Sequence, residues 1–279
     1  MNKMRMLVIN EADTATMSVT VGDEVPTLPV SNLGVYNNSR IFRSLSRDET
    51  VIVGTLSNIR LLSAVVLWRH NLTNAATFRL ELFGGPEATG ELLYDSADIF
   101  AAEQKLWTDW DWRIEPVVSS VLDDWAIRYG QHWFDPVFCQ SFRLTIKDPL
   151  NPAMQLDITR LYIGRHFEPD VNFSYGNSWE FDSNETQFRT DDGSLFGQAA
   201  PQFRKMQFSL DWLTPADRTA LLSAIRHVGR SRDFYISLFP EAGGQKEVET
   251  AFACKFTAYP ALDSNFYNNH KAQLTVEEC

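Results

Sequence analysis

The chain has 279 residues, of which 44% are hydrophobic, and a formal net charge of −11 at pH 7. A chain of this length buries roughly three quarters of its unfolded surface, and its length predicts about two domains. The acidic excess is spread along the chain, with 15 basic and 20 acidic residues before His166 and 10 and 16 from His166 onward, which argues against a general affinity for nucleic acid.

The N-terminal residues and the cysteines restrict the cellular compartment. The apolar run Met6–Ile9 ends at Asn10 and is too short for the hydrophobic region of a secretory signal. No segment approaches the roughly 18 apolar residues of a membrane-spanning helix, so we expect no membrane insertion. Cys139, Cys254 and Cys279 are far apart and lack C-x-x-C spacing. This argues against a disulfide scaffold or a zinc site and fits folding in a reducing cytoplasm.

Up to about residue 165, short strand signals alternate with turn signals. Apolar and β-branched residues form brief runs, and segments rich in Gly, Pro and Asn separate them. Val25–Asn38 is one such segment and predicts an extended loop. The predicted strands are Met4–Ile9, Met17–Val21, Thr50–Gly54, Ser63–Trp68, Thr77–Phe83, Leu92–Asp95, Phe138–Ile146 and Leu156–Ile163.

The stretch Met206–Phe239 predicts a strand, a sharply bounded helix and a second strand. Met206–Trp212 alternates apolar and polar residues with a period of two. The helix is predicted over 215–228, with Thr214 as N-cap, Pro215 in the first turn, Asp217 three residues after the cap and Gly229 after the last turn. We expect Leu221, Leu222 and Ile225 to pack against the sheet that contains Phe208, Leu210 and Phe234.

The remaining signals complete an all-β fold with one prominent helix. Asp191-Asp192-Gly193 predicts a turn, Val248–Phe256 a hairpin and Ala272–Val276 a closing strand. Gly164–Asp170 is the best linker candidate, because Pro169 follows a charged step after a full run of strands. We therefore expect two β-sandwich domains, over 1–165 and 166–279.

Signals for catalysis are poor. The chain has no G-x-S-x-G elbow, no H-E-x-x-H pair, no phosphate loop and no dinucleotide fingerprint. Asp109, Asp111, Asp123 and Asp124 could supply the paired carboxylates of a glycoside hydrolase, but sequence does not fix their separation. The five histidines show no ligand spacing. The expectation is a protein that is not an enzyme and that holds no metal or cofactor.

Tryptophans concentrate in one short region and form the best candidate for a ligand or protein-contact surface. Trp107, Trp110 and Trp112 are its core, with Trp125 and Trp133 nearby. Indole faces stack on sugar rings and anchor protein contacts. If residues 108–114 form a strand, Trp110 and Trp112 point the same way. The alternative is that these rings fill the sandwich core, which is the more common role of a tryptophan.

Two charged clusters have a simpler and a functional interpretation. The acidic residues of 182–185 and 191–194 could bind calcium, but Asp-Gly between strands is more often a turn. Arg226, Arg230 and Arg232 gather at the C-terminal end of the predicted helix, where cations complement the helix dipole. The same arginines could instead meet acidic groups of a neighbouring subunit.

Two resemblances organise these patterns. The region 31–165 resembles the galactose-binding-like jelly roll, the discoidin-type β-sandwich of many carbohydrate-binding modules and phage tail proteins. The region from His166 onward resembles the tail-tube-like β-sandwich of bacteriophage distal-tail proteins, beginning at Trp179-Glu180-Phe181 and including the strand–helix–strand unit. In distal-tail proteins the ring-building domain usually comes first. The first resemblance is carried by Arg40–Ser44, Val53–Leu56, Ser63–Trp68, His70–Leu72, Ala76–Phe83 and Leu93–Ser96.

Together the resemblances imply a structural component of a phage tail tip or baseplate, assembled in the host cytoplasm and located in the virion. The second domain would build a ring that continues the tail tube, with six-fold symmetry favoured over three-fold, and the jelly roll would dock other tail proteins. DNA would pass through the lumen without specific binding. The alternative function is a host-adsorption tail protein that binds glycans of the host.

Overall fold

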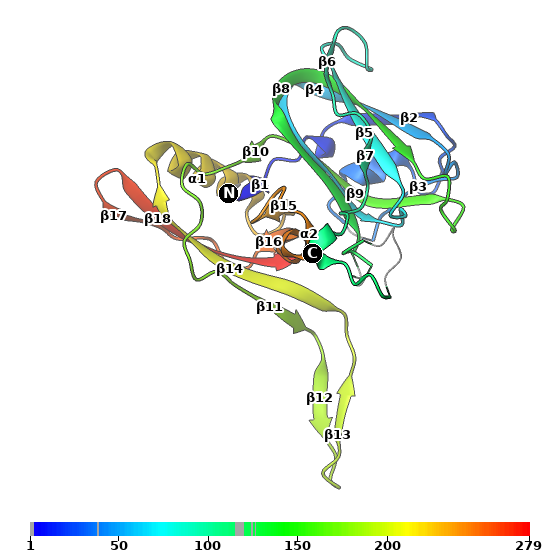
Figure 1. Cartoon of the computed structure of the whole chain (residues 1–279). Coiled ribbons are helices and arrows are strands. Elements are labelled where there is room, and N and C mark those ends of the chain that lie inside the picture. The colour runs from blue at the N-terminus through cyan, green and yellow to red at the C-terminus, as the bar shows by residue number, and fades with distance from the viewer. Residues whose placement is uncertain (1–2, 38, 115–119, 124, 126) are drawn as a thin grey trace. The chain divides into compact units, whose positions relative to one another are not determined.

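The computed structural model describes residues 3–37, 39–114, 120–123, 125 and 127–279 and divides the chain into two units (Figure 1). Unit 1 comprises Met1–Glu168 together with Phe234–Phe252, and unit 2 comprises Pro169–Asp233 together with Ala253–Cys279. Both units are built mainly from antiparallel strands, so the predicted all-β class is confirmed. The predicted division into 1–165 and 166–279 differs from this arrangement, because the segment 234–252 returns to unit 1.

Most strands of unit 1 form one folded sheet. Its path is β3-β9-β4-β8-β5-β6, with β2 added to β4 and β7 added to β5. Two long strands, β4 (Thr50–His70) and β8 (Tyr129–Lys147), carry the fold. The other strands are β2 (Thr16–Val21), β3 (Phe42–Ser44), β5 (Thr77–Phe83), β6 (Leu92–Asp95), β7 (Ile99–Phe100) and β9 (Leu156–Gly164), with 3-10 turns η1 (Glu11–Asp13), η2 (Val30–Gly34) and η3 (Trp107–Asp109).

Each half of β4 has its own neighbours, and this difference turns one sheet into a sandwich. The first half, from Thr50 to Thr55, pairs with β2 and with the second half of β8. The register shifts between Thr55 and Arg60, after which β4 pairs with the first half of β8 and with β9. The separately predicted strands Thr50–Gly54 and Ser63–Trp68 are therefore one continuous strand that bends at its exposed middle.

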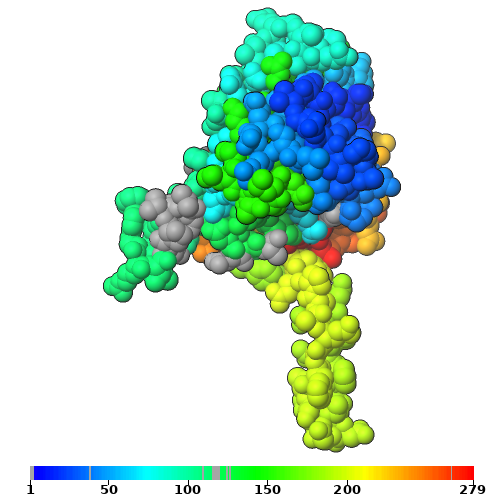
Figure 2. Space-filling model, turned by 90° about the vertical axis from the view of Figure 1, so that its right-hand side faces the viewer, coloured from blue at the N-terminus to red at the C-terminus, as the bar shows by residue number. Residues whose placement is uncertain are grey.

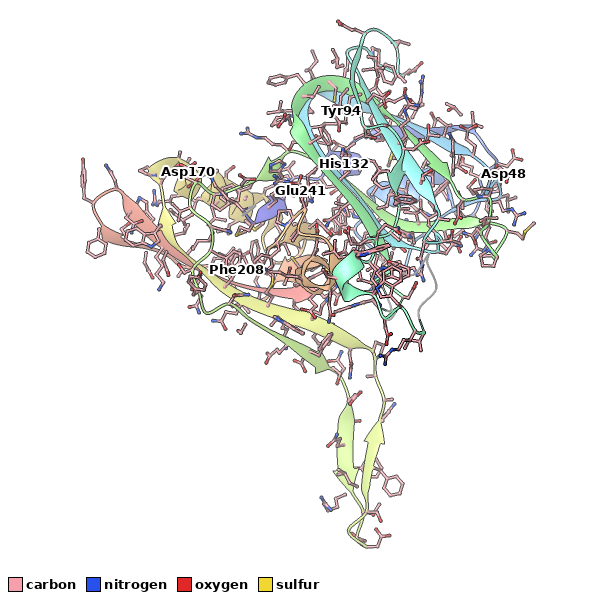
Figure 3. All side chains as sticks on the ribbon, in the orientation of Figure 1. Asp48, Tyr94, His132, Asp170, Phe208 and Glu241 are labelled. Carbon is pink, nitrogen blue, oxygen red and sulfur yellow. The ribbon has the colours of Figure 1, made fainter. Side chains whose placement is uncertain are left out.

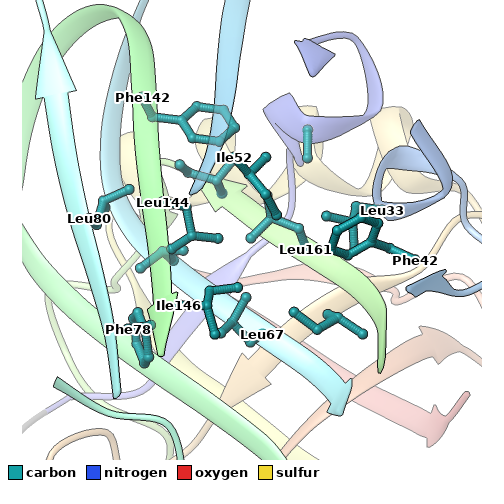
Figure 4. Packing of buried hydrophobic residues seen from close by; sticks show 14 of the residues in the cluster. Leu33, Phe42, Ile52, Leu67, Phe78, Leu80, Phe142, Leu144, Ile146 and Leu161 are labelled. Atoms are coloured by element: carbon teal, nitrogen blue, oxygen red, sulfur yellow. The ribbon is translucent and has the colours of Figure 1, made fainter. Parts of the chain in front are cut away.

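The main core of unit 1 lies between the two layers. Ile52, Leu80 and Phe142 come from one layer and Leu67 and Leu161 from the other, and all five are fully buried in one cluster (Figure 4). Burial of side chains of this size contributes about 1.5–3 kcal/mol each. Because side chains alternate between the two faces of a strand, the residues next to these core residues point to the outer face of their layer. The outer face of the second layer, which contains the second half of β4 and β9, is also covered.

A second, aromatic core covers the outer face of β4 and β9. Trp68 follows the core residue Leu67 and Tyr162 follows Leu161, so both rings point to the outer face. They meet Tyr235 at ring-centroid distances of 5.9 Å and 6.0 Å. Tyr235 lies on β15 (Phe234–Ser237), which pairs with β1 (Arg5–Leu7), and β1 pairs in turn with β10 (His166–Phe167). All three strands belong to unit 1.

The pairing of β15 explains why 234–252 leaves the second predicted domain. β15 forms the predicted strand after the helix, but it pairs with β1 at the start of the chain, with Met6 opposite Ile236. The short helix α2 (Gly244–Thr250) follows, where part of the hairpin Val248–Phe256 was predicted. β16 (Ala251–Phe256) then leads into unit 2. No local sequence pattern predicts a strand pairing between residues so far apart in sequence.

Unit 2 is built around the long strand β14 (Gln202–Leu213). β14 pairs with β18 on one side and β11 on the other, and β17 pairs with β18. A separate two-stranded ribbon, β12 with β13, continues the β11–β14 hairpin. The other elements are α1 (Pro215–Val228), β11 (Ser178–Ser183), β12 (Thr186–Arg189), β13 (Leu195–Gln198), β17 (Leu262–Phe266) and β18 (Asn269–Glu278).

The predicted helix α1 is confirmed together with its caps. The Thr214 hydroxyl accepts a hydrogen bond from the Asp217 backbone N–H at 3.2 Å, and the Gly229 N–H donates to the Ile225 carbonyl at 2.8 Å. The Asp217 carboxylate accepts a hydrogen bond from the Asp170 backbone N–H at 3.1 Å, and Figure 3 shows Asp170 beside α1. Asp217 therefore ties the segment before β11 to the helix.

Two predicted apolar positions of this region are wrong. Leu221 and Ile225 are buried, whereas Leu222 is 40% exposed, because it lies beside rather than on the buried stripe of α1. Met206, Phe208 and Leu210 are buried as the alternation predicts. Trp212 breaks the series and is exposed, because the pairing of β14 with β18 shifts register between Leu210 and Leu213.

None of the helices in the described ranges has the length and apolar character that a membrane span requires. Cys139 and Cys254 are buried free thiols and Cys279 is a partly exposed one.

Candidate functional site

The three tryptophans named from the sequence lie together on a loop of unit 1. Trp107 begins the turn η3, and Trp110 and Trp112 follow it. The ring centroids of Trp107 and Trp112 are 4.3 Å apart with the ring planes at 69°, and those of Trp110 and Trp112 are 5.4 Å apart at 32°. The condition that residues 108–114 form a strand is not met, since a 3-10 turn and further turns take its place. Turn geometry, not strand alternation, brings the rings together.

The cluster of Trp107, Trp110 and Trp112 (the tryptophan cluster) faces solvent. Trp107 is 77% exposed and Trp112 is 56% exposed, while Trp110 is half-buried and donates its indole N–H to the Lys105 carbonyl at 3.4 Å. The interpretation of these rings as core filling is therefore wrong for Trp107 and Trp112. It holds for Trp133, which is only 6% exposed and lies in the aromatic core.

The tryptophan cluster lies on the loop between β7 and β8 (the tryptophan-bearing loop). Several hydrogen bonds hold the two ends of this loop on the sandwich. The His70 imidazole, at the end of β4, bonds the Ala101 carbonyl through Nε2 at 3.0 Å and accepts from the Leu72 N–H through Nδ1. The Ser120 hydroxyl donates to the Glu103 carbonyl at 2.5 Å. Burial lowers the pKa of His70 to about 4, so the ring is neutral at pH 7 and donates from Nε2. These hydrogen bonds fix the positions of the residues at the two ends of the loop.

Two carboxyl groups, the half-buried Glu103 and the buried Glu247, lie near the base of this loop. Glu247, on α2, is almost fully buried and accepts from the backbone N–H groups of Glu241 at 2.9 Å and Gly243 at 2.7 Å. Burial, with the Glu247 charge as the second cause, raises the pKa of Glu103 to about 7. The backbone N–H of Gly244 hydrogen-bonds Glu103 and acts in the opposite direction.

Of the four aspartates that could form a hydrolase pair, two have side chains in the described part of the chain, and each has a partner. Asp123 forms an ion pair with Arg128 at 2.9 Å and accepts from Asn74, so it closes the base of the loop. Asp111 accepts from the Arg113 backbone N–H at 3.1 Å. Asp124 and the side chain of Asp109 lie outside the described residues. The two that are described therefore have structural partners.

A polar pocket that the sequence did not reveal lies elsewhere on unit 1. It has a volume of about 640 Å³ and is lined in part by Arg5, Trp133, His166, Glu168 and Glu241. The Arg5 guanidinium pairs with Glu168 at 2.9 Å and Glu241 at 3.0 Å and lies over the Trp133 ring. These pairings use the charges of Arg5, Glu168 and Glu241. Only the pairing of β1 with β10 and β15 assembles it, so no local signal could have found it.

The arginine cluster of unit 2 lies where the sequence predicted. Arg226 is in the last turn of α1, Arg230 and Arg232 follow it, and all three are exposed. Arg232 hydrogen-bonds the His227 ring at 3.3 Å. In the described part of the chain, no carboxylate forms an ion pair with Arg226 or Arg230. Their charges are therefore available to a partner.

The acidic segments of unit 2 form turns and pairs. Gly193 has a φ of +86° at the turn between β12 and β13, as the Asp-Gly signal predicts. The Asp182 carboxylate pairs with Lys205. Within the described ranges, no group of three or more His, Cys, Asp or Glu side chains has the arrangement of a metal site.

Comparisons with known proteins give structural neighbours only. No family model and no curated protein matches the chain. Similar solved structures include chitosan-binding module 1 of a chitosanase/glucanase from Paenibacillus sp. IK-5 (9% identity, 56% of this chain and 99% of that chain, TM-score 0.39) and the family 32 carbohydrate-binding module of C. perfringens NanJ in complex with galactose (12%, 59% and 99%, 0.38). A third is the lectin domain of lectinolysin complexed with Lewis B antigen (10%, 56% and 96%, 0.39).

These three neighbours are carbohydrate-binding modules or lectin domains, and none is a phage tail or baseplate protein. At such identities and TM-scores the likeness does not establish a shared function. What this chain binds must be argued from its own surface.

Proposed function

We propose that unit 1 is a carbohydrate-binding module whose ligand surface is the tryptophan cluster. The exposure of Trp107 and Trp112 carries this proposal. An indole buries 150–250 Å² when covered, so leaving two of them in water forgoes much apolar burial. A contact that covers these rings would recover that free energy.

The chemistry of the cluster fits a sugar ring better than a purely apolar ligand. A pyranose has C–H faces that pack on an indole and hydroxyl groups around its rim. The 69° angle between Trp107 and Trp112 forms a corner in which one ring supports a sugar face and the other its edge. The exposed side chains of Asp111 and Arg113 stand next to Trp112 in sequence and offer an acceptor and donors for hydroxyl groups. Binding, with no catalytic step, is the proposed activity.

A glycan array probed with the full chain tests this proposal, followed by titration of the best sugar. Trp107→Ala and Trp112→Ala should each weaken binding by about tenfold or more, as interface tryptophans do. Trp212→Ala is the matched control, since Trp212 is an exposed tryptophan of unit 2, and it should leave affinity unchanged. A silent array, or equal affinity of all three variants, would contradict the proposal.

A second function, favoured by the ribbon β12–β13, is that of a structural component of a phage tail tip or baseplate. A ribbon that carries apolar side chains beyond the sheet of unit 2 is suited to contact another subunit. In this proposal the protein belongs to the virion, contributes to a ring of six or three copies, and lets DNA pass without holding it. Unit 1 would then serve as a docking surface or bind glycans of the host.

Negative-stain images of the purified protein test the second function. Closed rings support it. Isolated monomers at high concentration contradict ring closure by the protein alone. Fluorescence anisotropy with labelled duplex DNA adds a further check, because micromolar affinity at about 0.15 M salt would contradict a lumen that does not hold phosphates.

A further inference from the structure

The ribbon β12–β13 exposes large apolar side chains on a two-stranded sheet. Phe188 and Phe196 are directly opposite each other in the register, and their rings stack at 5.9 Å with an angle of 18°. Both remain more than half exposed, as does Leu195. Figure 1 and Figure 2 show the ribbon, in yellow-green and yellow, with no other segment of unit 2 packed along it in either view. An isolated two-stranded ribbon is marginally stable in water, so a surface that covers it would stabilise it.

The ribbon is also acidic. The segment 184–201 carries Glu185, Asp191 and Asp192 against a single base, Arg189. Hydrogen bonds from the Thr190 hydroxyl and the Ser194 backbone N–H lower the pKa of Asp192, so its carboxylate stays ionised. Arg189 donates to the Gly193 carbonyl at 2.7 Å and is held within the turn. The ribbon therefore offers an apolar face and an anionic tip.

The C-terminal end of α1 has the complementary chemistry. Arg226 and Arg230 are exposed and lack ion pairs within the described residues. Leu222 lies four residues before Arg226, so the two share one face of the helix, and Leu222 is exposed. The exposed Tyr259 lies next to Gly229, since a Cβ placed on Gly229 would be 3.6 Å from the Tyr259 hydroxyl. Apolar and cationic groups thus adjoin at this end.

We propose that the ribbon of one copy docks on the C-terminal end of α1 of a second copy. Phe188 and Phe196 would cover Leu222 and Tyr259, and the acidic tip would meet Arg226 and Arg230. Complementary charge within one chain identifies the occupant as a second copy. Figure 1 shows the ribbon extending away from α1 within unit 2, so the two surfaces are separate.

The two surfaces differ, so the contact is heterologous and repeats from copy to copy until it closes or extends. This inference is independent of glycan binding by unit 1. It deepens the structural function by naming the surfaces that meet, and its test separates the two questions.

Sedimentation velocity of the full chain over a concentration series tests the contact. The unmodified chain should self-associate, and the association should weaken with salt because charges contribute. Phe188→Ser/Phe196→Ser should raise the dissociation constant at least tenfold. Asp191→Lys/Asp192→Lys and Arg226→Glu/Arg230→Glu should each do the same, since each creates a like-charge contact. Asp48→Lys/Glu91→Lys, on exposed positions of unit 1, makes the same change in net charge as the Asp191/Asp192 variant and should have no effect.

Mixing the two charge-reversed variants gives the sharpest result. Each variant alone opposes like charges, whereas an equimolar mixture again pairs opposite charges at every contact, so association should return. A monomeric unmodified chain would overturn the inference. So would association that all four variants retain, although that second result would leave a ring built through other surfaces intact.

Discussion

Trp68 and Trp107 carry the same side chain in unit 1 and occupy opposite environments. Trp68 is completely buried between Tyr129 and Tyr235, with ring centroids 5.7 Å and 5.9 Å away. Trp107 packs on Trp112 alone among the ring pairs described and leaves most of its surface in water. Trp68 lies on a strand whose two faces are both covered, whereas Trp107 lies on a turn.

This difference separates two roles of aromatic residues. The buried aromatic core joins β4 and β9 to β15, so it contributes to folding of unit 1. The tryptophan cluster is largely exposed, so we expect it to contribute little to folding, and we propose it as the binding surface. Whether a ring is stabilising or functional depends on what covers it, and substitutions of paired residues can measure that dependence.

The largest expected effect is the loss of Trp68. Trp68→Ala removes a fully buried indole, and such truncations cost about 3–5 kcal/mol because a cavity remains. Trp107→Ala should cost less than about 0.5 kcal/mol, as exposed substitutions do. Urea unfolding monitored by circular dichroism measures both changes. Equal losses for the two variants would show that the tryptophan cluster is part of the folding core.

The same contrast can be measured between adjacent leucines of unit 2. Leu221→Ala removes a buried side chain of α1 and should lower the free energy of unfolding by about 2–4 kcal/mol. Leu222→Ala, one residue later on the exposed side, should cost less than about 1 kcal/mol, since it removes a half-exposed side chain from an alanine-tolerant helix position. Thermal melts of the full chain compare them. Similar melting temperatures would show that the helix face is misassigned.

Sequence patterns correctly predicted the structural features that depend only on residues close together in the chain. The caps and bounds of α1 could be read directly, because Thr214, Pro215 and Gly229 act within a turn of their own positions. The alternation of Met206, Phe208 and Leu210 likewise gave the correct buried face of β14. The turn at Gly193 followed from its conformational freedom.

Sequence patterns failed where a contact joins distant residues. Periodicity shows that Phe234–Ser237 is a strand, but not that its partner is Arg5–Leu7. It does not show that one strand crosses both layers of a sandwich, as β4 does. The exposure of Trp107 could be stated only as one of two alternatives, since an apolar residue type favours burial and only the absence of covering residues shows otherwise. A register shift similarly exposes Trp212.

A pH series sharpens the comparison at the base of the tryptophan-bearing loop. Because burial raises the pKa of Glu103 to about 7, the folded state favours its protonated form. Its contribution is fully present below its ordinary pKa of 4.5 and is lost as pH rises through about 7. Stability should therefore fall between pH 5 and pH 8, by up to about 3 kcal/mol.

Glu103→Gln removes this titration and is the matched control, because glutamine keeps the size of the side chain and cannot ionise. The variant should show a flatter stability profile over the same range. An unchanged slope in the variant would mean that another titrating group causes the loss of stability. That group is not His70, because its effect on stability has the opposite dependence on pH. The lowered pKa of His70, about 4, makes stability fall as pH decreases from 6.5 toward 4.

The smallest effect on stability, and the most direct measure of exposure, comes from fluorescence quenching. Acrylamide is neutral and reaches only indoles that water reaches, so Trp107 and Trp112 should account for much of the quenchable emission. Trp107→Phe/Trp112→Phe should lower the accessible fraction while changing the free energy of unfolding by less than about 0.5 kcal/mol. Trp133→Phe, at a buried position of the aromatic core, should not lower the accessible fraction. If a saturating glycan protects the unmodified chain to the level of the double variant, the exposed rings are the covered rings. If the glycan binds and quenching is unaltered, the ligand lies elsewhere.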